Sequence, residues 1–261
     1  MPALSVDGFQ LSYQRRGTGP ALLFLHSILT DSRVWRHQLD AFSDEFTVVA
    51  WDAPGCGKTD CLPQGSGMAD YARLLSQFLD ALELSSVHIA GAAWGSTLGL
   101  ELYRLRPDLV QSLTLSSAYA GWKGSLSAEE VSRRLDRFRQ QTQLPPEAVI
   151  GAWIPTFVTP GASKETVDAI VEMMREMDPY GCQCMAEALA ISDHRPFLAS
   201  VTVPVLVING EADRRAPVAV ARAIHESIPG SRMEIIPGAG HLPYLERPEP
   251  FNAALRAFLP S

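Results

Sequence analysis

The chain has 261 residues, of which 46% are hydrophobic and 20% charged, and its formal net charge is -7. This composition is typical of one soluble globular unit with a full core. The acidic balance, without any run of basic residues, argues against nucleic acid or a membrane as a partner. No segment approaches the roughly 18 uninterrupted apolar residues of a membrane span, so we expect a cytoplasmic protein.

Short apolar runs alternate with helical patterns through the first 120 residues. The runs that predict strands are 9–14, 21–26, 46–52, 87–91 and 112–115, and the segment 68–82 predicts an amphipathic helix. Strands that are apolar on both faces and separated by helices indicate a parallel sheet with helices on both sides.

The pattern changes in residues 121–200, where no run predicts a strand. Amphipathic helices are expected there at 128–141, 145–157, 163–177 and 179–191. The alternation then resumes, with strands at 204–209 and 233–236 and helices at 216–228 and 248–258. We therefore expect an α/β core formed by 1–120 and 201–261, and a helical lid insert formed by 121–200.

The stretch around Ala93 predicts a strand, a tight turn and a helix. Gly91 and Gly95 bracket Ala93 in the spacing of the G-x-S-x-G motif. Such a sharp turn needs small neighbours, and the helix that follows directs backbone N–H groups at the turn, where an anionic intermediate can bind. Alanine has no hydroxyl, however, and cannot be a nucleophile. Ser96 lies about one turn into the helix and should point elsewhere.

This stretch, G-x-A-W-G-S-T-L, resembles the G-x-S-W-G-S-T-L form of some peptidases and esterases of the α/β-hydrolase family. The resemblance covers nearly the whole chain. It implies the α/β-hydrolase fold, a mostly parallel sheet flanked by helices with a helical lid, and it places Ala93 at the position of the catalytic serine.

Three interpretations of Ala93 compete. The chain can be a serine hydrolase in which a Ser→Ala change traps a ligand. It can have lost the nucleophile naturally and be a ligand-binding or signalling protein. It can also use only a His/Asp pair, as a cofactor-free oxygenase or lyase. We favour the first, because a strained turn costs on the order of 1–3 kcal/mol and an unused turn would be free to relax.

In this family the acid and then the base follow the nucleophile along the chain. Asp213 ends a G-x-x-D turn after an apolar strand, which resembles the family's acid turn, whereas Glu211 matches it less well. His241 follows two glycines in a loop and is the implied base. It would take a proton from the nucleophile and return it to the leaving group, while Asp213 holds the imidazole in the required tautomer.

The first core strand ends in Leu25-His26-Ser27-Ile28, where the family usually has H-G-x. The positions of Ile28 and Trp94 relative to the family's motifs imply that their backbone N–H groups form the oxyanion hole. Ser27 departs from the usual glycine, which weakens the Ile28 assignment or adds a hydroxyl near the substrate. His26 is expected to anchor the loop.

Bulky residues of the insert and of the segment before it should select the substrate. The side chains expected to contact it are Ser27, Tyr119, Trp122, Trp153 and Phe157. They predict an apolar pocket that tolerates aromatic groups. No cation is singled out as a carboxylate clamp, although Lys123, Arg133 and Arg137 remain candidates.

The segment 179–193 resembles the lid of enol-lactonases and related small-ester hydrolases. We therefore expect a serine hydrolase that acts on a small to medium, largely apolar ester or lactone through an acyl-enzyme. The chain as given should be inactive because of Ala93. Neither a metal nor another cofactor is expected, and the protein should be a monomer or a homodimer.

Overall fold

The computed structural model describes residues 2–260, and its centre is an eight-stranded sheet in the order β1-β2-β4-β3-β5-β6-β7-β8. The pairs β1–β2 and β2–β4 are antiparallel, and the remaining pairs are parallel. The strands are β1 (Ala3–Val6), β2 (Phe9–Arg16), β3 (Ala21–Leu25), β4 (Thr47–Trp51), β5 (Val87–Ala92), β6 (Val110–Ser116), β7 (Val205–Gly210) and β8 (Arg232–Ile236).

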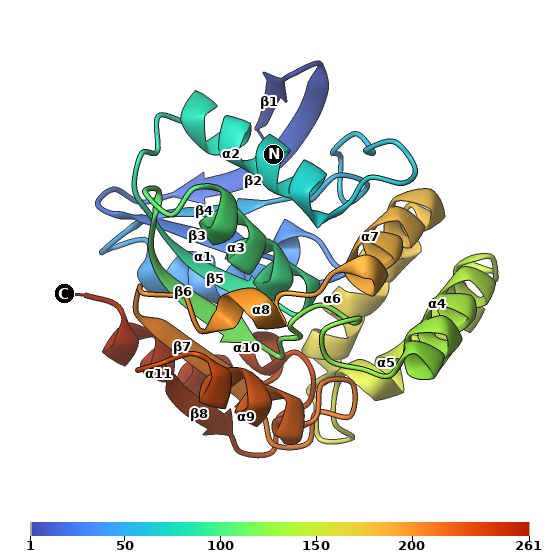
Figure 1. The fold of residues 1–261 in the computed structure, drawn as a ribbon. Helices are drawn as coiled ribbons and strands as arrows, with labels where there is room; N and C mark the ends of the chain where they lie inside the picture. The colour runs from blue at the N-terminus through green and yellow to red at the C-terminus, as the bar shows by residue number, and fades with distance from the viewer. Residues whose placement is uncertain (1, 261) are drawn as a thin grey trace.

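Helices cover both faces of this sheet, which confirms the expected fold class. Figure 1 shows α2 (Met68–Ala81), α3 (Trp94–Leu105) and α9 (Val218–Ser227) in front of the sheet, with α1 (Arg36–Phe42) and α11 (Pro248–Phe258) behind it. Every residue of β3, β4 and β5 is consequently buried. This double burial explains why these strands are almost continuously apolar in sequence.

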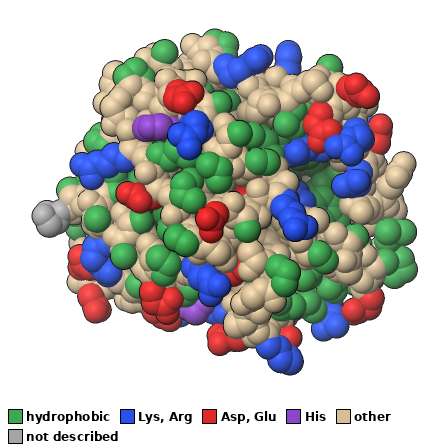
Figure 2. Space-filling model, turned by 90° about the horizontal axis from the view of Figure 1, so that it is seen from below, with side chains coloured by type: hydrophobic (Ala, Val, Ile, Leu, Met, Phe, Trp, Pro, Cys, Tyr) green, Lys and Arg blue, Asp and Glu red, His purple; other side chains and the backbone are tan. Residues whose placement is uncertain are grey.

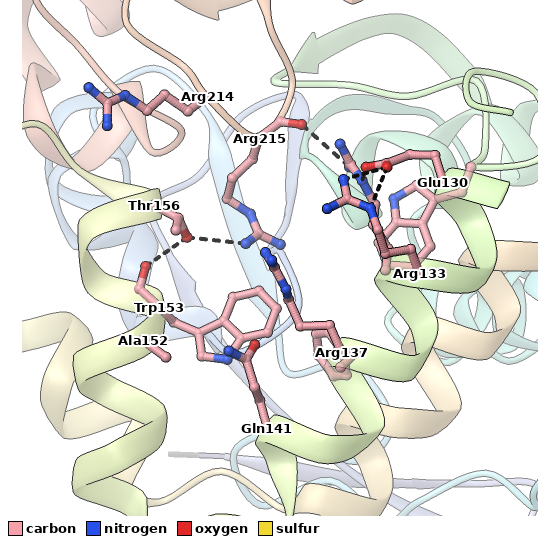
Figure 3. A pocket seen from close by; sticks show the side chains of 12 residues that line it. Glu130, Arg133, Arg137, Gln141, Ala152, Trp153, Thr156, Arg214 and Arg215 are labelled. Carbon is pink, nitrogen blue, oxygen red and sulfur yellow. Dashed lines mark hydrogen bonds and ion pairs between the residues drawn. The ribbon is translucent and has the colours of Figure 1, made fainter.

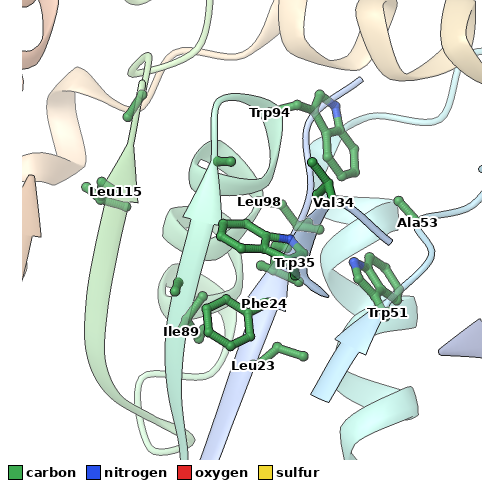
Figure 4. Close-up of a cluster of buried hydrophobic side chains, with 14 of the residues drawn as sticks. Leu23, Phe24, Val34, Trp35, Trp51, Ala53, Ile89, Trp94, Leu98 and Leu115 are labelled. Carbon is green, nitrogen blue, oxygen red and sulfur yellow. The ribbon is translucent and has the colours of Figure 1, made fainter. Parts of the chain in front are cut away.

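The core is continuous from the sheet into the helices behind it. Aromatic rings from separate elements meet there (Figure 4): Phe24 of β3 lies 4.8 Å from Trp35, measured between ring centroids. Trp35 in turn stacks at 4.1 Å on Tyr244. These contacts hold the segment after β3 against the helices of the C-terminal segment, and so they fix the loop that carries Ser27.

Four helices lie between β6 and β7 in the chain: α4 (Ala128–Thr142), α5 (Pro146–Phe157), α6 (Lys164–Arg175) and α7 (Pro179–Ile191). They stand together beside the sheet, on the right in Figure 1. The indole Nε1 of Trp94 donates to the Met185 carbonyl of α7 at 3.0 Å, which ties the start of α3 to this group. Among residues 2–260, none of the helices combines the length and apolarity that crossing a bilayer requires.

Five short elements were not predicted. They are β1, η1 (Ser32–Trp35), α1, α8 (Arg195–Leu198) and α10 (Pro243–Glu246). Helices of four to seven residues show too few turns for a helical period, and β1 lacks the continuous apolar run that marks the buried strands. The predicted strands and helices are all present, with ends that differ by a few residues.

Candidate active site

Ala93 forms the turn between β5 and α3 in a backbone conformation that alanine rarely adopts. Its φ is 48° and its ψ is -106°. A residue in such a sparsely populated region costs of order 1–3 kcal/mol. The strand before it and the helix after it are both buried. The surrounding packing therefore imposes the turn on Ala93.

The two bracketing glycines are required by close backbone approach. A Cβ at Gly91 would lie 2.5 Å from the carbonyl oxygen of Gly95, and a Cβ at Gly95 would lie 2.2 Å from that of Leu25. Neither residue has a positive φ. The glycine spacing found in the sequence therefore reflects the contact of the turn with α3 and with the end of β3.

Asp213 and His241 meet behind this turn. Asp213 follows β7, and its Oδ2 lies 2.9 Å from Nδ1 of His241. Its Oδ1 accepts the backbone N–H groups of Arg215 and Ala216 at 2.8 and 2.9 Å. Burial alone would raise the pKa of the Asp213 carboxyl, but His241 and these N–H groups hold it below its ordinary value. The carboxylate is thus charged, so Nδ1 of His241 carries a proton and Nε2 can accept one.

The competing acid, Glu211, lies elsewhere. Its side chain is exposed, and Oε2 accepts the backbone N–H of Gly238 at 3.0 Å. The imidazole of His241 is held by Phe157. The two rings stack with their centroids 5.6 Å apart, and the backbone N–H of His241 donates to the Phe157 carbonyl at 2.7 Å. These contacts aim His241 toward the turn that contains Ala93.

A small cavity of about 20 Å³ lies between the turn and the base. It is lined by Ser27, Ile28, Ala93, Trp94, Tyr119, Trp122, Arg134, Leu189, Arg215 and His241. The structure therefore brings together most of the residues that the sequence suggested. Trp94 is the first residue of α3, so its backbone N–H has no acceptor within the helix and is available at the cavity.

The two remaining substrate-binding candidates lie next to this cavity and not in its wall. Trp153 lines a neighbouring cavity. The ring of Phe157 stacks on the Trp153 ring, with the two ring centroids 6.1 Å apart. Ser96 does not face Ala93, because its hydroxyl donates to the carbonyls of Gly91 and Ser116 at 2.8 and 3.1 Å.

His26 is a structural part of the loop after β3. Its Nε2 accepts the backbone N–H of Ala53 at 2.9 Å, so its Nδ1 is the protonated nitrogen and donates to the Ser27 carbonyl at 2.7 Å. Burial lowers the pKa of this imidazole, which favours the neutral form that such a bridge needs. Ser27 and Ile28 are held at the cavity by this bridge.

Sequence reasoning missed two cations at the cavity. Arg215 comes two residues after Asp213, and its guanidinium carbon lies 4.5 and 4.8 Å from the ring centroids of Trp153 and Phe157. Arg134 of α4 donates to the Tyr119 hydroxyl at 2.9 Å. Of the earlier candidates, Arg133 and Arg137 line the neighbouring cavity, whereas Lys123 lines neither of the two.

Known proteins are similar to this chain in both sequence and fold. The family described as alpha/beta hydrolase fold matches residues 20–248. The 3-oxoadipate enol-lactonase 2 of Acinetobacter baylyi is 27% identical over 98% of this chain and 95% of its own length. The karrikin insensitive 2 receptor IA of Petunia hybrida is 27% identical over 89% and 88%.

Among solved structures, a thermophilic esterase from Thermogutta terrifontis superposes with a TM-score of 0.90. It is 25% identical, and the match covers 98% of this chain and 96% of the esterase. The family match spans most of the chain and includes the Ala93 turn, the Asp213 turn and the His241 loop. The chain therefore belongs to the α/β-hydrolase family.

Proposed function

We propose that this site is built to hydrolyse a carboxylic ester or lactone through an acyl-enzyme, with residue 93 at the position of the nucleophile. The chain as given then binds such a substrate without turning it over. The observation that carries the proposal is the costly backbone of Ala93 beside a hydrogen-bonded Asp213–His241 pair. Enzymes named enol-lactonase and esterase among the similar proteins support the same class of substrate.

With a serine at position 93, each remaining group has a defined task. His241 Nε2 takes the hydroxyl proton as the serine oxygen attacks the acyl carbonyl, and Asp213 stabilises the resulting imidazolium. The backbone N–H groups of Ile28 and Trp94 receive the developing oxyanion, each worth about 3 kcal/mol in sites of this kind. His241 then returns the proton to the leaving alcohol, and water attacks the acyl group by the same route.

The helices α4 to α7 act as the lid in this proposal. Arg134 of α4 and Leu189 of α7 line the cavity beside Ala93, while Phe157 of α5 packs on His241. A substrate larger than the cavity of about 20 Å³ needs these helices to shift outward. Their return over the bound acyl group would exclude bulk water from the oxyanion.

The test is to replace Ala93 by serine and to assay p-nitrophenyl butyrate and a panel of lactones. Hydrolysis is expected for Ala93→Ser and not for the chain as given. The double variant Ala93→Ser with His241→Ala should lose it again. Ser96→Ala in the Ala93→Ser background is the matched control, because the Ser96 hydroxyl faces the main chain, and it should keep the activity. An Ala93→Ser protein that is folded but inert toward the whole panel would refute the proposal.

A second candidate function is ligand binding without turnover, as a receptor or signalling protein. Two observations favour it: Ala93 has no hydroxyl, and one of the similar proteins is named a receptor. It predicts tight binding by the chain as given and no turnover by Ala93→Ser. A third outcome of the same assay, turnover by the unaltered chain that His241→Ala abolishes, would instead identify chemistry that uses the His/Asp pair alone.

A further inference from the structure

A second cavity, of about 220 Å³, adjoins the one beside Ala93 and shares Trp122, Arg134 and Arg215 with it. Its charged lining residues are Glu130, Arg133, Arg134, Arg137, Arg214 and Arg215. Five cations therefore face one carboxylate, although the whole chain has a net charge of -7. In Figure 2, Lys and Arg side chains border a hollow on the right, the side on which Figure 1 shows α4 and α5.

The single carboxylate is shared between two of these arginines. Glu130 accepts a hydrogen bond from Nε of Arg133 at 2.9 Å and one from Nε of Arg134 at 2.7 Å. Arg137 makes no hydrogen bond or ion pair with any residue in the described range 2–260. Figure 3 shows Arg137 and Arg215 extending toward each other, whereas Arg214 points away. Two like charges thus face one another without an intervening carboxylate.

Arg215 is held rigidly but is only partly satisfied. Its Nη1 donates to the Thr156 hydroxyl at 3.2 Å, and its guanidinium lies over the Trp153 and Phe157 rings. Its Nε is buried and has no hydrogen-bond partner within residues 2–260. Burial lowers the pKa of Arg215 to about 10, and the charges of Arg134 and Arg137 act in the same direction. A buried, unpaired guanidinium is costly, and an anion in this cavity would remove much of that cost.

We propose that this cavity binds a carboxylate of the substrate, carried on the same ester or lactone whose carbonyl is placed at residue 93. The inference rests on the proposed function, since it names the class of substrate for that site. A guanidinium is planar and donates two parallel hydrogen bonds to a carboxylate, so Arg215 and Arg137 together suit such a group. The aromatic rings around Arg215 suit the carbon chain that joins the carboxylate to the ester.

Binding to the chain as given tests this without any turnover. The probes are monomethyl adipate, which keeps a free carboxylate, and dimethyl adipate, which is neutral, and the method is isothermal titration calorimetry. The half-ester should bind at least about tenfold more tightly, as expected for one charge-assisted pair, and added salt should weaken only the half-ester.

The variant is Arg137→Gln, which breaks no internal hydrogen bond and so should leave the fold intact. Arg222→Gln, at an exposed position of α9, is the matched control because it changes the net charge equally. Arg137→Gln should remove most of the preference for the half-ester, and Arg222→Gln should retain it. Equal binding of the two esters, or equal effects of the two variants, would overturn the carboxylate site.

The two proposals fail in different ways. If the half-ester binds through Arg137 but Ala93→Ser does not hydrolyse it, the hydrolase proposal falls and the carboxylate site stands. If Ala93→Ser hydrolyses both esters equally and Arg137→Gln changes neither rate, the hydrolase proposal stands and the carboxylate site falls.

Discussion

The strain at Ala93 can be measured by removing the side chain that causes it. Ala93→Gly releases the cost of a φ of 48°, which is of order 1–3 kcal/mol. The same change removes one buried methyl, worth about 0.8 kcal/mol, and adds about 0.5–1 kcal/mol of chain entropy to the unfolded state. These opposing amounts nearly cancel, so the free energy of unfolding should change little.

Ala92→Gly provides the reference. Ala92 ends β5, is 1% exposed against 7% for Ala93, and does not have a positive φ. The variant should lose the buried methyl and add chain entropy to the unfolded state, but it relieves no backbone strain. We therefore expect its free energy of unfolding to fall by about 1–2 kcal/mol. The difference between the two variants is then the strain itself, about 1–3 kcal/mol.

The assay is urea unfolding followed by far-ultraviolet circular dichroism, which avoids the indole of Trp94 beside the mutated site. Equal slopes with urea concentration would show that the two variants expose the same surface on unfolding. If Ala93→Gly proves as destabilising as Ala92→Gly, the turn is not strained. A site built around residue 93 would then lose its main structural support.

Three further predictions concern residues outside the catalytic pair. Gly95→Ala should destabilise the protein by more than about 2 kcal/mol in the same assay, because its Cβ would lie 2.2 Å from a carbonyl oxygen of β3. Gly151→Ala, where a Cβ meets nothing within 4 Å, should be neutral or stabilising, by up to about 1 kcal/mol. Burial alone would raise the pKa of Glu101, but His194 and Arg104 lower it to about 2, so the pairing stabilises the fold above pH 4.5. Glu101→Gln should therefore be less stable at pH 6 by up to about 3 kcal/mol, and the gap should close as the pH falls toward 2; a constant gap would contradict the pairing.

The parts of the site that the sequence predicts are those with local causes. Gly91 and Gly95 are needed by contacts within one turn and its nearest strand, so their spacing is visible in the chain. Asp213 lies in a tight turn at the end of a buried strand, which is also a local pattern. Pairing of Asp213 with His241 follows from chain order only once the family resemblance is accepted.

The second cavity, whose lining includes five arginines, has no such local cause. Residues 130, 133, 134 and 137 lie three or four positions apart and so share one face of α4, which was the available signal. A solvated face and a cavity-lining face have the same spacing, however. The choice between them depends on how α4 packs against α5 and against the turn after β7. These contacts join segments far apart in sequence.

Arg215 links the two halves of the site. Its backbone N–H donates to Asp213, while its side chain lines both cavities, so one residue both fixes the acid and faces the proposed carboxylate. The molecule bears two separate costs at this place, a strained backbone at residue 93 and a buried Asp213–His241 pair. Apolar residues in place of such a pair are often neutral or stabilising, and the backbone of residue 93 lowers stability, so the fold gains from neither. The acyl transfer proposed for residue 93 would account for both costs at once, because it needs the sharp turn to present a nucleophile and the charged acid to orient the base.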